Sequence, residues 1–174
     1  ASSRLGFSPS RTMRAAQKLY EGGHITYMRT DSFSLSKQAL ASIASLVEQR
    51  YGKEYVNVTQ YQTKSKNAQE AHEAIRPTNV NLASAGITDD QKSLYDLILK
   101  RTITSQMVEA RMIRTKLIAN INDESIPAFT TNGVRLIFDG WLACDPQSRG
   151  DDVELPIVSK GDPLEVLEIN NTQK

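Results

Sequence analysis

Hydrophobic residues recur at helical spacing in three stretches of the first 110 residues, and residues that favour helix ends bound each stretch. The first predicted helix has Ser8 as its N-terminal cap and Pro9 in its first turn, and it ends at Gly22 and Gly23. Its expected apolar stripe contains Met13, Ala16, Leu19 and Tyr20. The other faces then carry mainly Arg11, Arg14, Gln17 and Lys18.

Two more helices are predicted further along the chain. One begins near Ser34 or Ser36, buries Leu40, Ile43 and Val47, and ends before Gly52. The other starts at a capping box of Thr88 and Gln91 and has Leu94, Leu97 and Ile98 as its apolar stripe. Between these helices we expect a polar loop over residues 51–67. A short helix or helical turn is expected in "AQEAHEAIRPT" (68–78), ended by Pro77.

From about residue 111 the pattern changes to short β-rich runs such as "RTKLIANIND", "PAFTTNG", "VRLIFDGW" and "PLEVLEIN". Asn132-Gly133 lies between two of these runs and predicts a hairpin turn there. The sequence therefore predicts an α+β protein, with a helical domain over residues 1–110 and a β-rich segment over residues 111–174.

Composition narrows the class of protein. The 174 residues are 39% hydrophobic and 24% charged, which is typical of a globular protein. No apolar run approaches the roughly 20 residues of a membrane span, and the first ten residues lack the apolar core of a signal peptide. Cys144 is the only cysteine, so no internal disulfide can form. We expect a soluble cytoplasmic protein without a membrane partner.

The net charge is only +1, but positive charge is concentrated near the N-terminus. Residues 2–29 contain five basic side chains and one acidic side chain, Glu21. Such a local excess binds phosphate even in a nearly neutral chain. On the first helix, Arg14 and Lys18 would contact phosphates and Gln17 a base or sugar. The alternative, an ordinary solvated helix face, stays open.

The segment "HITYMRTDS" (24–32) contains the first candidate for chemistry. If it is extended, alternation places Tyr27, Arg29 and Asp31 on one face and Met28 on the other. A tyrosine phenol can attack phosphorus, although forming its anion at pH 7 costs about 4 kcal/mol, and an arginine fork matches a phosphate. Thr30 and Asp31 either orient the arginine or only form the following turn. The alternative for the tyrosine is simple packing.

The second candidate is "EAHEAIRPT", which contains Glu70, His72, Glu73 and Arg76. On a helix, His72 and Arg76 share a face and can meet one phosphate. A zinc-protease site is excluded because the second histidine is missing, and no phosphate loop, CxxC pair or magnesium-type acidic cluster occurs in the chain. We therefore predict no metal site here. A solvated helix with a chance histidine is the alternative.

Together these segments resemble a known family. "RLGFSPSRTMRAAQKLYEGGHITYMRTDS" followed by "QEAHEAIRPT" is similar to the central part of bacterial type IA DNA topoisomerase I, and the similarity continues through "FDGW" to the C-terminus. It implies relaxation of negatively supercoiled DNA by transient single-strand cleavage, strand passage and religation. Tyr27 would form the 5′-phosphotyrosine link and Arg29 would position the scissile phosphate. His72 would contact nearby DNA or the surroundings of the reacting phosphate, with Glu73 and Arg76 as supporting neighbours at the DNA. Thr30 and Asp31 are also expected to contact the DNA.

The resemblance also implies what surrounds this segment. The helical domain would be winged-helix-like, and the β-rich segment would belong to the arch that opens for strand passage. The partners would be single-stranded DNA and the remaining domains of the same parent chain, in the nucleoid-associated cytoplasm. Those domains would supply the ligands for Mg²⁺, so that the 174-residue fragment would be inactive alone. Two alternatives stay open, namely a single-stranded DNA-binding module and a structural hinge without catalysis.

Overall fold

The computed structural model describes residues 1–61, 72–121, 125–150, 153–168 and 170. Two compact units are present: Ala1–Ala110 with Asp139–Arg149, and Arg111–Phe138 with Gly150–Lys174. Helices dominate the first unit and an antiparallel strand pair the second, which confirms the α+β class. The β-rich segment expected from residue 111 onward is interrupted, because Asp139–Arg149 returns to the helical unit. The winged-helix-like character stays a prediction.

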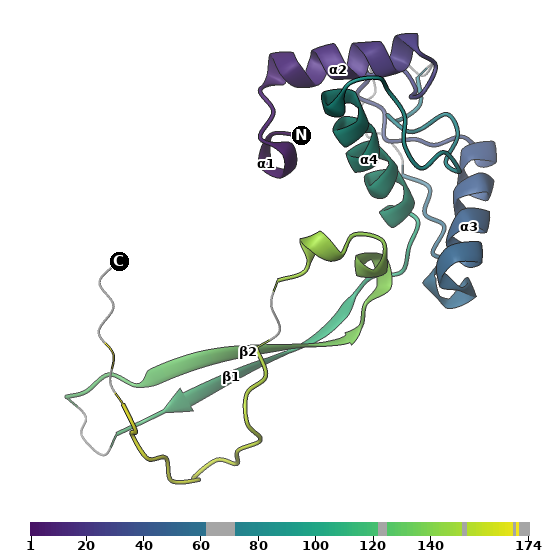
Figure 1. Ribbon diagram of the computed structural model, residues 1–174. Coiled ribbons are helices and arrows are strands. Elements are labelled where there is room, and N and C mark those ends of the chain that lie inside the picture. The colour runs from purple at the N-terminus through teal and green to yellow at the C-terminus, as the bar shows by residue number, and fades with distance from the viewer. Residues whose placement is uncertain (62–71, 122–124, 151–152, 169, 171–174) are drawn as a thin grey trace. The chain divides into compact units, whose positions relative to one another are not determined.

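Local capping determines where the helices of the first unit begin. They are α1 (Ser2–Leu5), α2 (Pro9–Glu21), α3 (Lys37–Tyr51) and α4 (Asp89–Thr104) (Figure 1). Ser8, Ser36 and Thr88 cap the last three, each accepting a hydrogen bond from the backbone N–H three residues later. The three helices expected from the sequence are thus confirmed. In the described part of the chain, no helix has the length and apolar character needed to cross a bilayer.

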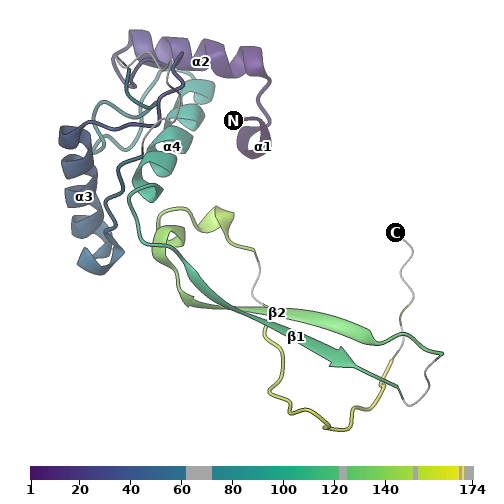
Figure 2. The same ribbon diagram turned by 180° about the vertical axis from the view of Figure 1, so that it is seen from behind.

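The core of this unit lies between α2, α3 and α4. Helix α2 crosses α4 near its N-terminal end, where Arg11 forms an ion pair with Asp90, and α3 lies to one side of α4 (Figures 1 and 2). Five side chains on these helices expose at most 2% of their surface: Leu19, Ile43, Val47, Tyr95 and Ile103. Burying each such side chain contributes about 1.5–3 kcal/mol before the entropy cost is subtracted.

The apolar stripe predicted for α2 is partly wrong. Ala15, Ala16 and Leu19 are buried, whereas Met13 and Tyr20 remain 38% and 41% exposed. Packing against α4 therefore uses a face of α2 rotated away from the one that the sequence suggested.

The loop predicted over residues 51–67 is only partly irregular. It contains the short 3₁₀ helix η1 (Lys53–Tyr55), and Val56 then forms a β-bridge with Met107; residues 62–67 lie outside the described residues. The returning segment Asp139–Arg149 packs beside this bridge. It is held there by the hydrogen bond from the Tyr55 hydroxyl to Asp139, at 2.8 Å.

The second unit is built on β1 (Arg111–Ala119) and β2 (Phe129–Phe138), which pair antiparallel. Asn132-Gly133 lies inside β2, so the hairpin turn predicted there is wrong and two of the expected runs are one strand. Gly133 is required for close packing: a Cβ atom would lie 2.8 Å from the Val153 carbonyl oxygen and 2.7 Å from Leu155. Among the described residues of "PLEVLEIN", none belongs to a strand.

Candidate active site around Tyr27

The end of α2 directs the chain into the candidate site. The Gly23 N–H donates to the Tyr20 carbonyl at 2.8 Å, and the His24 N–H donates to the Leu19 carbonyl at 2.9 Å. With Gly23 at φ +71°, these two bonds form a Schellman motif, which glycine adopts without the penalty that a Cβ atom carries. The sharp reversal after α2 therefore places residues 24–28 back against the helices.

Residues 24–26 then pair with residues 76–78, and this pairing brings the two sequence motifs together. Ile25 forms an antiparallel bridge with Pro77, and the Thr26 N–H donates to the Arg76 carbonyl at 2.9 Å. The Thr26 hydroxyl donates to the Ala74 carbonyl at 2.7 Å and accepts from the Arg76 N–H at 2.9 Å. The nucleophile candidate Tyr27 follows directly after this bonded residue.

Neither motif has the regular structure expected of it. Bends at Thr26, Met28 and Arg29 interrupt the extended segment, and both Ile25 and Met28 are buried, so the row of alternating side chains predicted over residues 25–31 does not form. Residues 72–78 are not helical, and residues 68–71, including Glu70, lie outside the described residues. The prediction that His72 and Arg76 share a helix face is therefore wrong.

Tyr27 lies between two aromatic rings from different elements. The Tyr20 ring, from α2, meets it edge-on with centroids 5.3 Å apart, and the His72 ring lies 5.2 Å away at an angle of 37°. Tyr27 is half-buried against the core, while His72 is exposed. The contact joins the tyrosine of the first motif to the histidine of the second, although about 45 positions separate them in the sequence.

Arg29 is exposed and forms no hydrogen bond or ion pair with any other described residue. Thr30 accepts a hydrogen bond from the Ser32 N–H at 3.0 Å and so stabilises the turn that leads toward α3. Asp31 is exposed, and among the described residues it forms neither a hydrogen bond nor an ion pair with Arg29. Of the two roles considered for Thr30, the structure supports turn formation.

The basic side chains of α2 differ in their surroundings. Lys18 pairs with Glu21 at 2.8 Å, and Gln17 donates to the same carboxylate at 2.9 Å. The hydrogen bonds from Lys18 and then from Gln17 lower the pKa of Glu21. Arg14 is exposed and has no ion pair or hydrogen bond within the described part of the chain. Arg11 and Lys18 form ion pairs, so Arg14 is the basic residue of α2 that lacks such a partner among the described residues.

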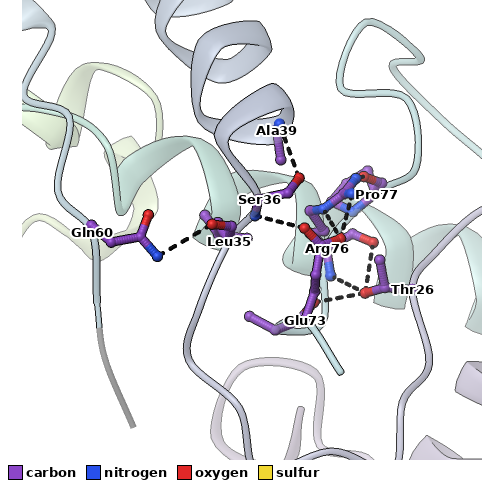
Figure 3. Close-up of polar contacts among 9 residues, drawn as sticks. Thr26, Leu35, Ser36, Ala39, Gln60, Glu73, Arg76 and Pro77 are labelled. Atoms are coloured by element: carbon purple, nitrogen blue, oxygen red, sulfur yellow. Dashed lines mark hydrogen bonds and ion pairs between the residues drawn. The ribbon is translucent and has the colours of Figure 1, made fainter. Parts of the chain in front are cut away.

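Glu73 and Arg76 are bound to each other next to the site, as Figure 3 shows. Their side chains are only 29% and 17% exposed. Burial opposes ionisation of Glu73, but hydrogen bonds from Ser36 and Arg76 outweigh it and lower the pKa of this carboxyl. Glu73 is therefore ionised at neutral pH.

An apolar cavity of about 750 Å³ flanks the site rather than containing it. Its lining includes Met28 and Ala74, exposed apolar residues such as Met13, Phe33 and Ile75, and the basic side chains of Arg4 and Arg101. Tyr27, Arg29 and His72 do not line it. Among the described residues, no three His, Cys, Asp or Glu side chains cluster as metal ligands.

Comparisons with known proteins identify the family. A sequence profile described as DNA topoisomerase matches residues 1–174. The chain belongs to the bacterial type IA DNA topoisomerase I family. It is 42% identical to DNA topoisomerase 1 of Synechocystis sp. over 98% of its length, and 44% identical to DNA topoisomerase 1 of Streptomyces coelicolor over 97%.

A solved structure of full-length topoisomerase I from Thermotoga maritima is also similar. Its TM-score is 0.74 at 36% identity, and the match covers 91% of this chain and 27% of that one. The chain spans about a fifth of the length of the curated topoisomerases that it matches, 20% for the Synechocystis relative and 19% for the Streptomyces relative. This topoisomerase sequence therefore corresponds to a single portion of its relatives.

Sequence reasoning missed three residues that shape this candidate site. Tyr20 was expected in the core, yet its ring contacts Tyr27. Thr26 of the first motif and Ser36 at the start of α3 both bind the second motif, through hydrogen bonds to residues about 37 to 50 positions away. No periodic pattern signals such contacts, because each depends on which distant backbone atoms the fold brings close.

Proposed function

We propose that this chain is the region of a type IA topoisomerase that carries the nucleophile, Tyr27. The phenol oxygen attacks a phosphodiester of single-stranded DNA, a tyrosine–phosphate bond forms, and the bond from phosphorus to the 3′ oxygen breaks. The phenol proton goes to the departing 3′ oxygen. Religation reverses these steps, and one phosphodiester replaces another, so the cycle requires no external energy source.

The placement of Tyr27 between Tyr20 and His72, with Arg29 exposed two residues later, supports this proposal. Two packed rings restrict the tyrosine side chain, so less entropy is lost when its oxygen is aligned with phosphorus. Arg29 stabilises the charge on the phosphate with a guanidinium that no other described residue engages. His72 contacts the DNA next to the reacting phosphate.

DNA phosphates would also contact Arg14 and Lys18, with Gln17 near a base or sugar and Asp31 beside the bound strand. The described residues do not form a magnesium site, so no step of this proposal passes through a metal held by this chain. In the proposal, Mg²⁺ and its ligands, together with the rest of the active site, belong to other domains of a longer parent chain.

The experiment uses a full-length type IA topoisomerase that contains this sequence, Mg²⁺ and a labelled single-stranded oligonucleotide. We expect a denaturant-resistant protein–DNA adduct that is lost in Tyr27→Phe. Tyr61→Phe is the matched control, because it removes another half-exposed phenol, whose hydroxyl makes a long hydrogen bond of 3.4 Å to the Ser105 carbonyl. An adduct that persists in Tyr27→Phe and disappears in Tyr61→Phe would refute the assignment.

A second candidate is a single-stranded DNA-binding module, which the exposed Arg14 and Arg29 favour. Such a module binds the oligonucleotide with an affinity that falls with salt, but it never gives an adduct in the presence of the other domains. The same experiment therefore separates the two functions. Binding that is absent while the protein is folded would favour a hinge role instead.

A further inference from the structure

A continuous set of hydrogen bonds runs from the start of α3 to the residue before Tyr27 (Figure 3). The Ser36 N–H donates to one oxygen of Glu73 at 2.6 Å. The other oxygen of Glu73 accepts from Nε of Arg76 at 3.1 Å and from its Nη2. The backbone of Arg76 then pairs with Thr26 on both its N–H and its carbonyl.

Three of the five guanidinium N–H groups of Arg76 take part in these and one further contact. Nε and Nη2 donate to Glu73, and Nη1 donates to the Pro77 carbonyl at 3.0 Å. A DNA phosphate that took the Nε and Nη2 edge would displace Glu73 and leave a partly buried carboxylate without its arginine partner. The two remaining N–H groups, on Nη1 and Nη2, belong to a side chain that is only 17% exposed. Binding of DNA by Arg76 is therefore disfavoured by the arrangement around it.

Glu73 also satisfies the start of a helix. The first N–H groups of an α-helix lack partners within the helix, and a carboxylate at this end interacts favourably with the helix dipole. Because Glu73 binds the N–H of the capping residue Ser36, segment 73–76 is fixed to α3. His72 directly precedes segment 73–76. Tyr27 directly follows Thr26, which is hydrogen-bonded to Arg76, so the positions of both aromatic rings depend on this segment.

We propose that Glu73 and Arg76 are positioning residues, which hold His72 and Tyr27 in place for DNA cleavage and do not themselves bind DNA. This inference rests on the proposed function. The rings of Tyr27 and His72 lie 5.2 Å apart, and the two residues flank the paired segments: Tyr27 follows segment 24–26, and His72 precedes segment 76–78. Replacing Glu73 weakens the bond to Ser36 at the start of α3, and replacing Arg76 removes the partner that orients the Glu73 carboxylate. The Ala74 N–H still donates to the Ser34 carbonyl, so either change loosens the segment beside His72 without detaching it, while Arg29 and the basic residues of α2 keep their places.

The test compares Glu73→Gln, Arg76→Gln and the double variant in the full-length topoisomerase. Asp96→Asn is the matched control, because it breaks an exposed ion pair with Lys100 within α4. Three quantities are measured: the single-turnover rate of adduct formation with saturating oligonucleotide, the Kd at several salt concentrations, and Tm. The assay temperature lies well below the lowest Tm.

We expect each single variant to slow cleavage by roughly 10- to 100-fold, the loss typical of a reacting group displaced on the order of 1 Å. The double variant should be about as slow as either single one, because the pair acts as a unit. Kd and its salt dependence stay at the wild-type values, and Asp96→Asn cleaves normally. A purely structural role would lower Tm and leave this rate unchanged.

Two results would overturn the inference. Weaker binding by Arg76→Gln, with a salt slope smaller by about 1, would make this arginine a phosphate ligand. Wild-type cleavage rates in all variants would show that the pair does not position the site. If Glu73→Gln fails to fold, Glu73→Asp decides, because it keeps the charge but is one methylene too short to reach both partners. Failure of the proposed function itself is recognised separately, by a wild-type enzyme without a Tyr27-dependent adduct.

Discussion

Gly23→Ala tests whether the turn after α2 sets the position of the nucleophile. Gly23 has φ +71°, and a Cβ atom added there would have nothing within 4 Å. The substitution therefore adds no steric contact, and its effect comes from the backbone alone. An L-residue in the left-handed conformation costs roughly 1–2 kcal/mol.

Some of that cost is offset in the unfolded state. Alanine has fewer accessible conformations than glycine, which stabilises the folded protein by about 0.4–1 kcal/mol where the backbone is compatible. The difference leaves a net destabilisation of about 1 kcal/mol, corresponding to a fall in Tm of about 4 °C. Asparagine tolerates this conformation better than other non-glycine residues, so Gly23→Asn should lose less stability than Gly23→Ala.

Gly6→Ala is the matched control, because Gly6 ends α1 with φ +64° and also has nothing within 4 Å of an added Cβ. Urea unfolding should show similar losses for the two alanine variants. Adduct formation by the full-length topoisomerase should slow only in Gly23→Ala, since only this turn leads directly into Tyr27. Unchanged stability in Gly23→Ala, or equal slowing in both variants, would refute the reasoning.

Two further predictions concern other regions of the chain. The hydrogen bonds from Arg4 lower the pKa of buried Asp145, so this pair stabilises the fold at neutral pH. That contribution is lost as pH falls below the ordinary aspartate pKa of about 3.9 and through the lowered one; Arg4→Gln should reduce Tm at pH 7 but little at pH 2. Gly133→Ala should cost about 1–3 kcal/mol in urea unfolding, because its Cβ would meet the Val153 carbonyl, while Asn132→Ala is nearly neutral. Equal losses at the two positions would instead indicate a turn.

The helices were predictable because their signals are short-range. Ser8, Ser36 and Thr88 each bond a backbone N–H only three residues away, so the sequence itself contains both partners. Even here tertiary structure selects among options: Ser34 was an equal candidate for the second cap, but its hydroxyl donates to the Tyr61 carbonyl and its own carbonyl accepts from Ala74. A partner outside the helix therefore excluded it as the cap.

The failures have a different origin. Asn132-Gly133 carries a strong turn signal. However, residues 153–155 approach β2 so closely that only a residue without a Cβ atom fits at position 133 of the strand. The segment around His72 has helical composition, but Thr26 and Ser36 offer its backbone and carboxylate better partners than a helix would. In both cases a distant segment supplies a contact that outweighs the local preference.

The misplaced apolar residues of α2 connect these failures to function. Met13 and Tyr20 were expected in the core, but Met13 lines the cavity that flanks the site and Tyr20 contacts Tyr27. Departures from sequence rules tend to concentrate at functional sites, and two of those found in this chain, at Tyr20 of α2 and around His72, lie beside Tyr27.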